Sequence, residues 1–175
     1  MWAVSSWCRW GLSDHLARFN ALPDQEAEDQ LYAGFADRSW AARVASGRPY
    51  RDLDHLLDVA ELAWSELKPG DWLRALRAHP RIGEQGGHAP AVSEREQSGV
   101  RQASALTLAA LTAENRKYEE RFGHVFLVAA RGRSADEILR ALRRRMTNDP
   151  VTELEEAAAE QRKITRMRLL EMLDQ

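Results

Sequence analysis

Apolar residues recur at helical spacing along most of the chain, most clearly between residues 53 and 67. There the apolar positions follow an i, i+3, i+4 pattern: Leu53, Leu56, Leu57, Ala60, Leu62, Ala63 and Leu67. Valine, isoleucine and threonine are sparse beside alanine, leucine, arginine and glutamate, which favour helices. The pattern predicts an all-α fold, a single-domain irregular bundle of about eight or nine helices.

Capping residues and helix breakers place the helices of the N-terminal half. Ser13 is expected to cap a first helix, and Pro23-Asp24 to open a second. Ser39 is expected to start a third helix, which ends at Gly47. The helix with the apolar stripe begins after Asp52.

The following helix is expected to run from Asp71 to Ala78. It must end at His79, because Pro80 disfavours the α conformation in the residue before it. Residues 81–92 then contain Gly83, Gly86, Gly87 and Pro90. So many breakers predict an irregular loop of a length often kept for function.

A capping box is expected to begin the next helix. Ser93 and Glu96 have the required spacing, and the helix should continue through Tyr118 to Gly123, which can end it. Residues 126–130 form a short continuous apolar run without a partner strand, so we interpret them as buried extended chain or a helical turn.

The same signatures define the last two helices. Ser134 and Glu137 form a second capping box for a helix that reaches Met146. Asp149-Pro150 provides an N-cap and a first-turn proline for a final helix to about Leu173.

The length and composition fit one ordinary domain. The chain has 175 residues, 44% of them hydrophobic, which is enough to bury a core. No internal repeat or flexible linker is evident. We expect residues 1–10 to be an N-terminal extension and residues 11–175 to form the helical domain.

The charge balance argues against nucleic-acid binding. Lys and Arg number 25 against 27 Asp and Glu, a formal net charge of -2, whereas binding a polyanion needs clustered cations. Arg143, Arg144 and Arg145 are the best contrary signal. They lie at a predicted helix C-terminus, where the helix dipole favours cations, so we assign them to the surface.

The single cysteine, Cys8, can form neither an internal disulfide nor a thiolate metal site. This favours a reducing compartment, and we expect the cytoplasm. Arg9 interrupts the Trp-rich start, so we expect no signal peptide or membrane span. The histidines other than His79 are not spaced as zinc ligands, and no metal or organic cofactor is predicted.

His79 is the first candidate for chemistry. An imidazole titrates near neutrality and can exchange protons at working pH. Here it stands where Pro80 restricts the backbone and a glycine-rich loop can admit a small molecule. The alternative is that His79 only caps the helix C-terminus.

The second candidate is the segment from Ser93 to Gln97. A helix N-terminus there would offer free N–H groups beside the Glu96 carboxylate and the Gln97 carboxamide, which suit a polar heterocycle. The alternative is that Ser93 and Glu96 simply cap each other and Gln97 is exposed.

The third candidate is the run from Phe126 to Arg131, where a guanidinium suited to carboxylates and planar acceptors follows buried residues. The alternative is an arginine that emerges from the core.

Taken together and in order, these segments resemble the OHCU decarboxylase (2-oxo-4-hydroxy-4-carboxy-5-ureidoimidazoline decarboxylase) family. The similarity runs nearly from end to end. It comprises Asn20-Ala21-Leu22-Pro23, Trp40-Ala41, Arg48-Pro49-Tyr50, Asp71-Trp72-Leu73, His79-Pro80-Arg81-Ile82-Gly83, Glu96-Gln97-Ser98-Gly99, Tyr118, Arg121-Phe122-Gly123, Phe126 to Gly132, Asn148-Asp149-Pro150 and Glu153-Leu154. Residues 1–10 and the short glycine-rich loop depart from the family pattern.

The resemblance implies an all-helical, cofactor-free decarboxylase, usually a homodimer, that converts OHCU to (S)-allantoin in urate degradation. It implies catalytic roles for His79 and Glu96. It further implies substrate-contacting roles for Pro80, Ser93, Gln97, Leu127, Val128, Ala130 and Arg131.

Two other classes of function remain open from the sequence. One is a non-catalytic helical binding module, with the Trp-rich start and the amphipathic helices as its interface. Such a module would bind without turnover, and changing His79 would have little effect. The other is nucleic-acid binding through the arginine run, which requires affinity that falls steeply with salt.

Overall fold

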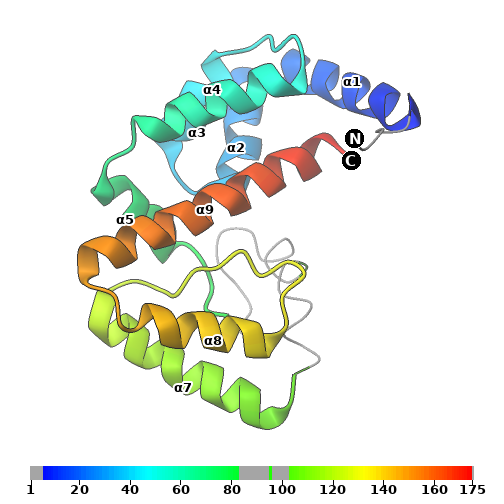
Figure 1. The fold of residues 1–175 in the computed structure, drawn as a ribbon. Coiled ribbons are helices and arrows are strands. Elements are labelled where there is room, and N and C mark those ends of the chain that lie inside the picture. Colours follow the sequence, from blue (N-terminus) through cyan, green and yellow to red (C-terminus); the bar gives the residue numbers. More distant parts are fainter. Residues whose placement is uncertain (1–5, 83–94, 96–102, 175) are drawn as a thin grey trace. The chain divides into compact units, whose positions relative to one another are not determined.

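Eight α-helices and no strand make up the regular structure of the described residues, 6–82, 95 and 103–174 of a computed structural model (Figure 1). The all-α prediction is confirmed. The helices are α1 (Ser6–Ala21), α2 (Asp24–Gly34), α3 (Arg38–Ser46), α4 (Leu53–Ser65), α5 (Pro69–Arg77), α7 (Ala105–Phe122), α8 (Ala135–Arg145) and α9 (Pro150–Leu173).

The chain divides into two units. Unit 1 contains residues 1–68 and 164–175, and unit 2 contains residues 69–163. In unit 1, α3 packs against both α2 and α4. Phe35 lies between two tryptophans there, with ring centroids 5.3 Å from Trp40 and 5.0 Å from Trp64.

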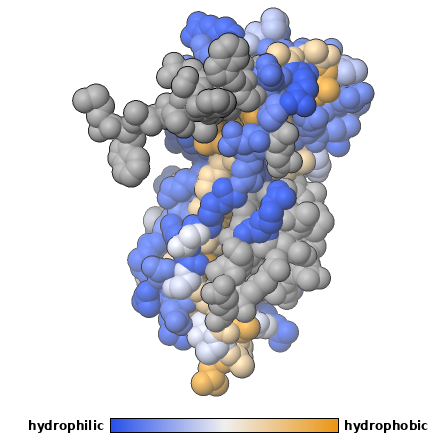
Figure 2. Space-filling view, turned by 90° about the vertical axis from the view of Figure 1, so that its right-hand side faces the viewer, coloured by the Kyte–Doolittle hydropathy of each residue, from blue (hydrophilic) through white to orange (hydrophobic). Residues whose placement is uncertain are grey.

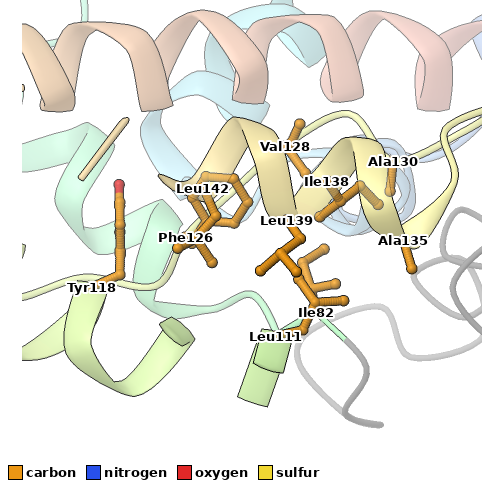
Figure 3. Packing of buried hydrophobic residues seen from close by; sticks show 10 residues of the cluster. All are labelled: Ile82, Leu111, Tyr118, Phe126, Val128, Ala130, Ala135, Ile138, Leu139 and Leu142. Carbon is orange, nitrogen blue, oxygen red and sulfur yellow. The ribbon is translucent and has the colours of Figure 1, made fainter. Parts of the chain in front are cut away.

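Unit 2 is built on a hydrophobic cluster between α7 and α8 (Figure 3). Each helix contributes one apolar face, and two non-helical segments fill the space between them. The buried members are Ile82, Leu111, Tyr118, Phe126, Val128, Ala130, Ala135, Ile138, Leu139 and Leu142. The cluster therefore joins the chain after His79 to the run at residues 126–130.

Several helix ends lie where the sequence predicts them. Both hydrogen bonds of the Ser134–Glu137 capping box are formed, and Asp149 accepts from the first-turn N–H groups of α9. Gly123 ends α7 in the left-handed conformation, with φ 73°. These signals succeed because local hydrogen bonds alone satisfy the free groups of a helix end.

Two predicted helix starts are wrong, and so is the predicted extent of a third helix. Ser13 lies inside α1, which begins at Ser6. Asp37, not Ser39, caps α3, because its carboxylate accepts both the Trp40 N–H and the Ser39 hydroxyl. The helix expected to run unbroken from Ser93 is interrupted, since Ser104 is non-helical and caps α7 itself.

The described surface is mostly polar on the face shown in Figure 2. The exposed large hydrophobic residues among the described residues are Leu62, Leu106 and Val151. No helix in the described ranges is both long and apolar enough to cross a membrane.

The division of the chain at residue 10 into an N-terminal extension and a helical domain stays a prediction.

Candidate active site

His79 follows the last turn of α5, as its neighbour Pro80 predicts. Its N–H still donates to the Leu76 carbonyl at 3.2 Å, and the chain leaves the helix at the proline. The side chain is 7% exposed, and Nε2 is shielded from solvent. The imidazole is therefore held inside unit 2 and not exposed at its surface.

The residues after His79 are fixed to α7. Arg81 donates to both carboxylate oxygens of Glu119, with Nε to Oε1 at 2.5 Å and Nη2 to Oε2 at 2.9 Å. Ile82 is 6% exposed and joins the hydrophobic cluster with Leu111. With α5 on one side and these two contacts on the other, the backbone around His79 has little freedom.

The run from Phe126 to Ala130 is neither helix nor strand, and it is largely buried. Its backbone is held by two side chains: Arg145 Nη1 donates to the Leu127 carbonyl at 2.6 Å, and the Ala129 N–H donates to Glu160 Oε2 at 2.8 Å. Side chains of α8 and α9 thus fix the backbone of the run on either side of Val128.

Arg131 lies in the turn that follows the buried run. The turn is closed by the Arg133 N–H, which donates to the Ala130 carbonyl at 3.0 Å, and Gly132 takes a left-handed φ of 75°. Arg131 is exposed, unlike the residues before it.

The structure brings Ile82, three residues after His79, onto the same hydrophobic cluster as Phe126, Val128 and Ala130. Ser93, Glu96 and Gln97 lie outside the described residues. Their predicted roles, and those of Pro80, Leu127, Val128, Ala130 and Arg131, stay predictions.

A buried polar network behind the run was missed by the sequence analysis. Arg145 and Glu153 form an ion pair at 2.5 Å, with side chains 1% and 0% exposed. The Tyr118 hydroxyl donates to the same carboxylate, and Asn148 donates to its second oxygen at 2.8 Å. The assignment of Arg145 to the surface is therefore wrong, because the face of α8 that carries Ile138 and Leu142 also carries Arg145.

Glu160 is the second anchor of the run. Burial alone would raise the pKa of its carboxyl group, but the hydrogen bonds from Lys163 and the Ala129 N–H, with the charges of Lys163 and Arg133, outweigh burial and lower that pKa. Glu160 is thus a carboxylate at neutral pH and can accept from Ala129.

His124 gives unit 2 a sensitivity to acid. Its ring lies 5.5 Å from that of Tyr118, and burial lowers its pKa despite opposing effects of the Val125 carbonyl and Glu153. The unfolded chain, with a histidine pKa of about 6.5, binds a proton before the folded chain does. Stability linked to His124 is therefore complete above that pH and decreases as the pH falls below it.

We expect the melting temperature of the protein to fall between pH 7.5 and 5.5, and to fall less in His124→Phe. Thermal melts of both proteins, followed by circular dichroism across this range, measure the difference. Equal pH slopes would show that His124 does not supply the linkage.

Unit 1 contains a hollow with a volume of about 430 Å³. It is lined by Asn20, Asp24, Arg48 and Pro49 among others. The polar groups are engaged within the chain: Arg48 donates to Asp24 and to the Phe19, Leu22 and Ala45 carbonyls, and Asn20 pairs with the Tyr50 backbone. The hollow therefore lies where helix ends meet, and the contacts within the chain account for its polar lining.

The fold and the site define an all-α protein with a buried histidine at the end of a helix. Comparison with known proteins identifies the family to which it belongs. A sequence model described as OHCU decarboxylase matches residues 20–170. The 2-oxo-4-hydroxy-4-carboxy-5-ureidoimidazoline decarboxylase of Haloferax volcanii is 31% identical over 159 residues, which cover 89% of this chain and 94% of that protein. The chain belongs to the OHCU decarboxylase family.

Two further matches agree. The uric acid degradation bifunctional protein TTL of Arabidopsis thaliana is 31% identical over 153 residues, 83% of this chain, and the chain spans about half of that protein (47%). The structure is also similar to a crystal structure of OHCU decarboxylase in the presence of (S)-allantoin, with a TM-score of 0.74 at 30% identity, covering 84% of this chain and 99% of the other.

Proposed function

We propose that this chain is a cofactor-free decarboxylase that converts OHCU to (S)-allantoin in urate degradation. The observation that carries the proposal is the position of His79, which is buried at a helix exit inside the segment that matches the decarboxylase family. The likeness to a decarboxylase crystallised with (S)-allantoin supports the same substrate class.

The substrate itself can accept the electrons released with carbon dioxide. When the bond from C4 to the carboxylate breaks, its electron pair forms a C4–C5 double bond, and the ring imine nitrogen takes the charge and a proton. A proton then adds to C5, which bears the ureido group, while the 4-hydroxyl loses its proton and becomes the ring carbonyl. The reaction therefore needs no external electron acceptor.

In this proposal His79 delivers or relays the proton to one face of the substrate carbon, which gives one enantiomer. Glu96 hydrogen-bonds the 4-hydroxyl. Ser93, Gln97 and Pro80 contact the ring and ureido edges. These roles rest on the family resemblance, together with the burial of His79.

The run from Leu127 to Arg131 contributes backbone contacts from Leu127, Val128 and Ala130. An arginine that gripped the departing carboxylate would stabilise the ground state and slow its loss, unless the transition state gained more. We therefore propose that Arg131 binds a carbonyl oxygen of the substrate.

One assay tests the activity. Urate, urate oxidase and hydroxyisourate hydrolase generate the unstable substrate in place, and circular dichroism follows (S)-allantoin with and without the protein. We expect the protein to accelerate the appearance of the signal. A rate equal to that of spontaneous decay would favour the non-catalytic binding module instead.

The assembly and location are part of the proposal. The resemblance and the single Cys8 support a homodimer in the cytoplasm. Sedimentation equilibrium of the full chain measures the oligomeric state, and fractionation of the source cells shows the compartment. A monomer across the working concentration range would contradict the homodimer.

A further inference from the structure

Asn115 carries a buried carboxamide that is hydrogen-bonded to none of the described residues. It lies on α7 and is 1% exposed. Among the described residues, neither its Oδ1 nor its Nδ2 has a hydrogen-bond partner. Buried polar groups are nearly always hydrogen-bonded, because an unmet donor or acceptor destabilises the folded state. The stability of the fold therefore does not explain a buried carboxamide whose oxygen and nitrogen both lack hydrogen-bond partners.

The position of Asn115 on α7 is defined by its neighbours. Leu111, Asn115 and Tyr118 are spaced at i, i+4 and i+7 and share one face of the helix. Leu111 and Tyr118 both belong to the hydrophobic cluster, and Figure 3 shows Leu111 beside Ile82. Asn115 thus lies on the face that packs against the two segments of the candidate site.

Two contacts bracket Asn115 against the residues that follow His79. One helical turn before it, Leu111 shares the cluster with Ile82. One turn after it, Glu119 holds Arg81. The carboxamide is therefore buried between two points where the His79–Ile82 segment is fixed to α7.

We infer that Asn115 is a further substrate-contacting residue, which hydrogen-bonds an amide edge of the ligand, either the ureido group or the ring N–H and carbonyl. This inference rests on the proposed function. A carboxamide offers one acceptor oxygen and two N–H donors. An edge with an adjacent N–H and carbonyl is its complement, and it satisfies both ends of the side chain at once.

The inference predicts that stability and activity respond differently to one substitution. Asn115→Leu keeps a branched side chain of similar shape but removes the unmet polar atoms. We expect its melting temperature to equal or exceed that of the wild type. We expect kcat/KM for OHCU to fall roughly tenfold or more, with weaker binding of (S)-allantoin in calorimetry, because the ligand loses its hydrogen bonds.

Asn20→Leu is the matched control, since it changes an asparagine of unit 1 whose carboxamide is hydrogen-bonded. Asn20 donates to the Tyr50 carbonyl and accepts the Tyr50 N–H, so its loss should lower the melting temperature. Its kcat/KM, measured where the variant is folded, should stay within about twofold of the wild type. Asn115→Ala, which cannot overpack the core, serves as the second test variant and should also lose activity.

The outcomes separate the two proposals. A wild-type protein that does not accelerate allantoin formation contradicts the proposed function. If the wild type is active and Asn115→Leu and Asn115→Ala match its kcat/KM and its (S)-allantoin affinity, the substrate contact is refuted. Asn115→Leu and Asn115→Ala proteins that both fail to fold would also overturn the inference, because the carboxamide would then be needed for the fold.

Discussion

His79→Asn is expected to remain folded and to lose at least about 100-fold in kcat for (S)-allantoin formation. A positioned general acid or base contributes about 100-fold to 10 000-fold, and asparagine cannot exchange a proton near neutral pH. Asparagine is smaller than histidine and polar, so the buried position after α5 should tolerate it. The coupled circular-dichroism assay gives kcat, and a thermal melt gives the stability of the same protein.

His55→Asn is the control for this substitution. His55 lies on α4 in unit 1 and is not one of the candidate site residues. Its backbone N–H donates to Asp52 Oδ1, and its ring Nδ1 accepts from the Arg51 N–H at 3.5 Å. We expect near-wild-type turnover. Should His79→Asn also retain near-wild-type turnover, His79 would have no role in proton transfer, and its burial would be structural.

The sequence predicted those helix ends that depend on neighbouring residues. The Ser134–Glu137 box, Gly123 and Asp149-Pro150 each satisfy helix ends through contacts within a few residues. The starts of α1 and α3 were missed. At α3 the prediction placed the start at Ser39, but Asp37, two positions earlier, is the cap, because its carboxylate accepts both the Trp40 N–H and the Ser39 hydroxyl.

In the candidate site, too, only the features that depend on neighbouring residues could be predicted from the sequence. Pro80 fixes the helix exit before it, so the place of His79 follows from two adjacent residues. The burial of its side chain does not follow from them, because it depends on Arg81 reaching Glu119 and on Ile82 entering the cluster. These contacts cross 29 residues or more of sequence, and no local pattern encodes them.

Arg145 shows most clearly what the sequence analysis failed to predict. In a run of three arginines at a helix end, charge alone suggests three solvated side chains. Helical periodicity distinguishes them, because Ile138, Leu142 and Arg145 share one face of α8. The side chains of Arg143 and Arg144 are 57% and 60% exposed, whereas that of Arg145 is 1% exposed. Its partner Glu153 comes from α9, which the sequence does not place beside it.

The ion pair of Arg145 and Glu153 is expected to be the most sensitive point of unit 2. Removing one member of a buried pair leaves the other charge desolvated, at a cost of about 3–5 kcal/mol. Arg145 also donates to the Leu127 carbonyl, and its guanidinium carbon lies 4.7 Å from the ring centroid of Phe126. Its loss should therefore loosen the run that we propose to contact the substrate.

We expect Arg145→Met to lower the free energy of unfolding by about 3–5 kcal/mol, measured by urea denaturation. Arg143→Met is the matched control two residues away, and it should unfold close to the wild type because its pair with Glu114 is exposed to solvent. The double variant Arg145→Met/Glu153→Met should regain part of the loss, since no charge is then left buried. If Arg145→Met unfolds like Arg143→Met, the buried pair does not stabilise unit 2, and Leu127 must be held by packing alone.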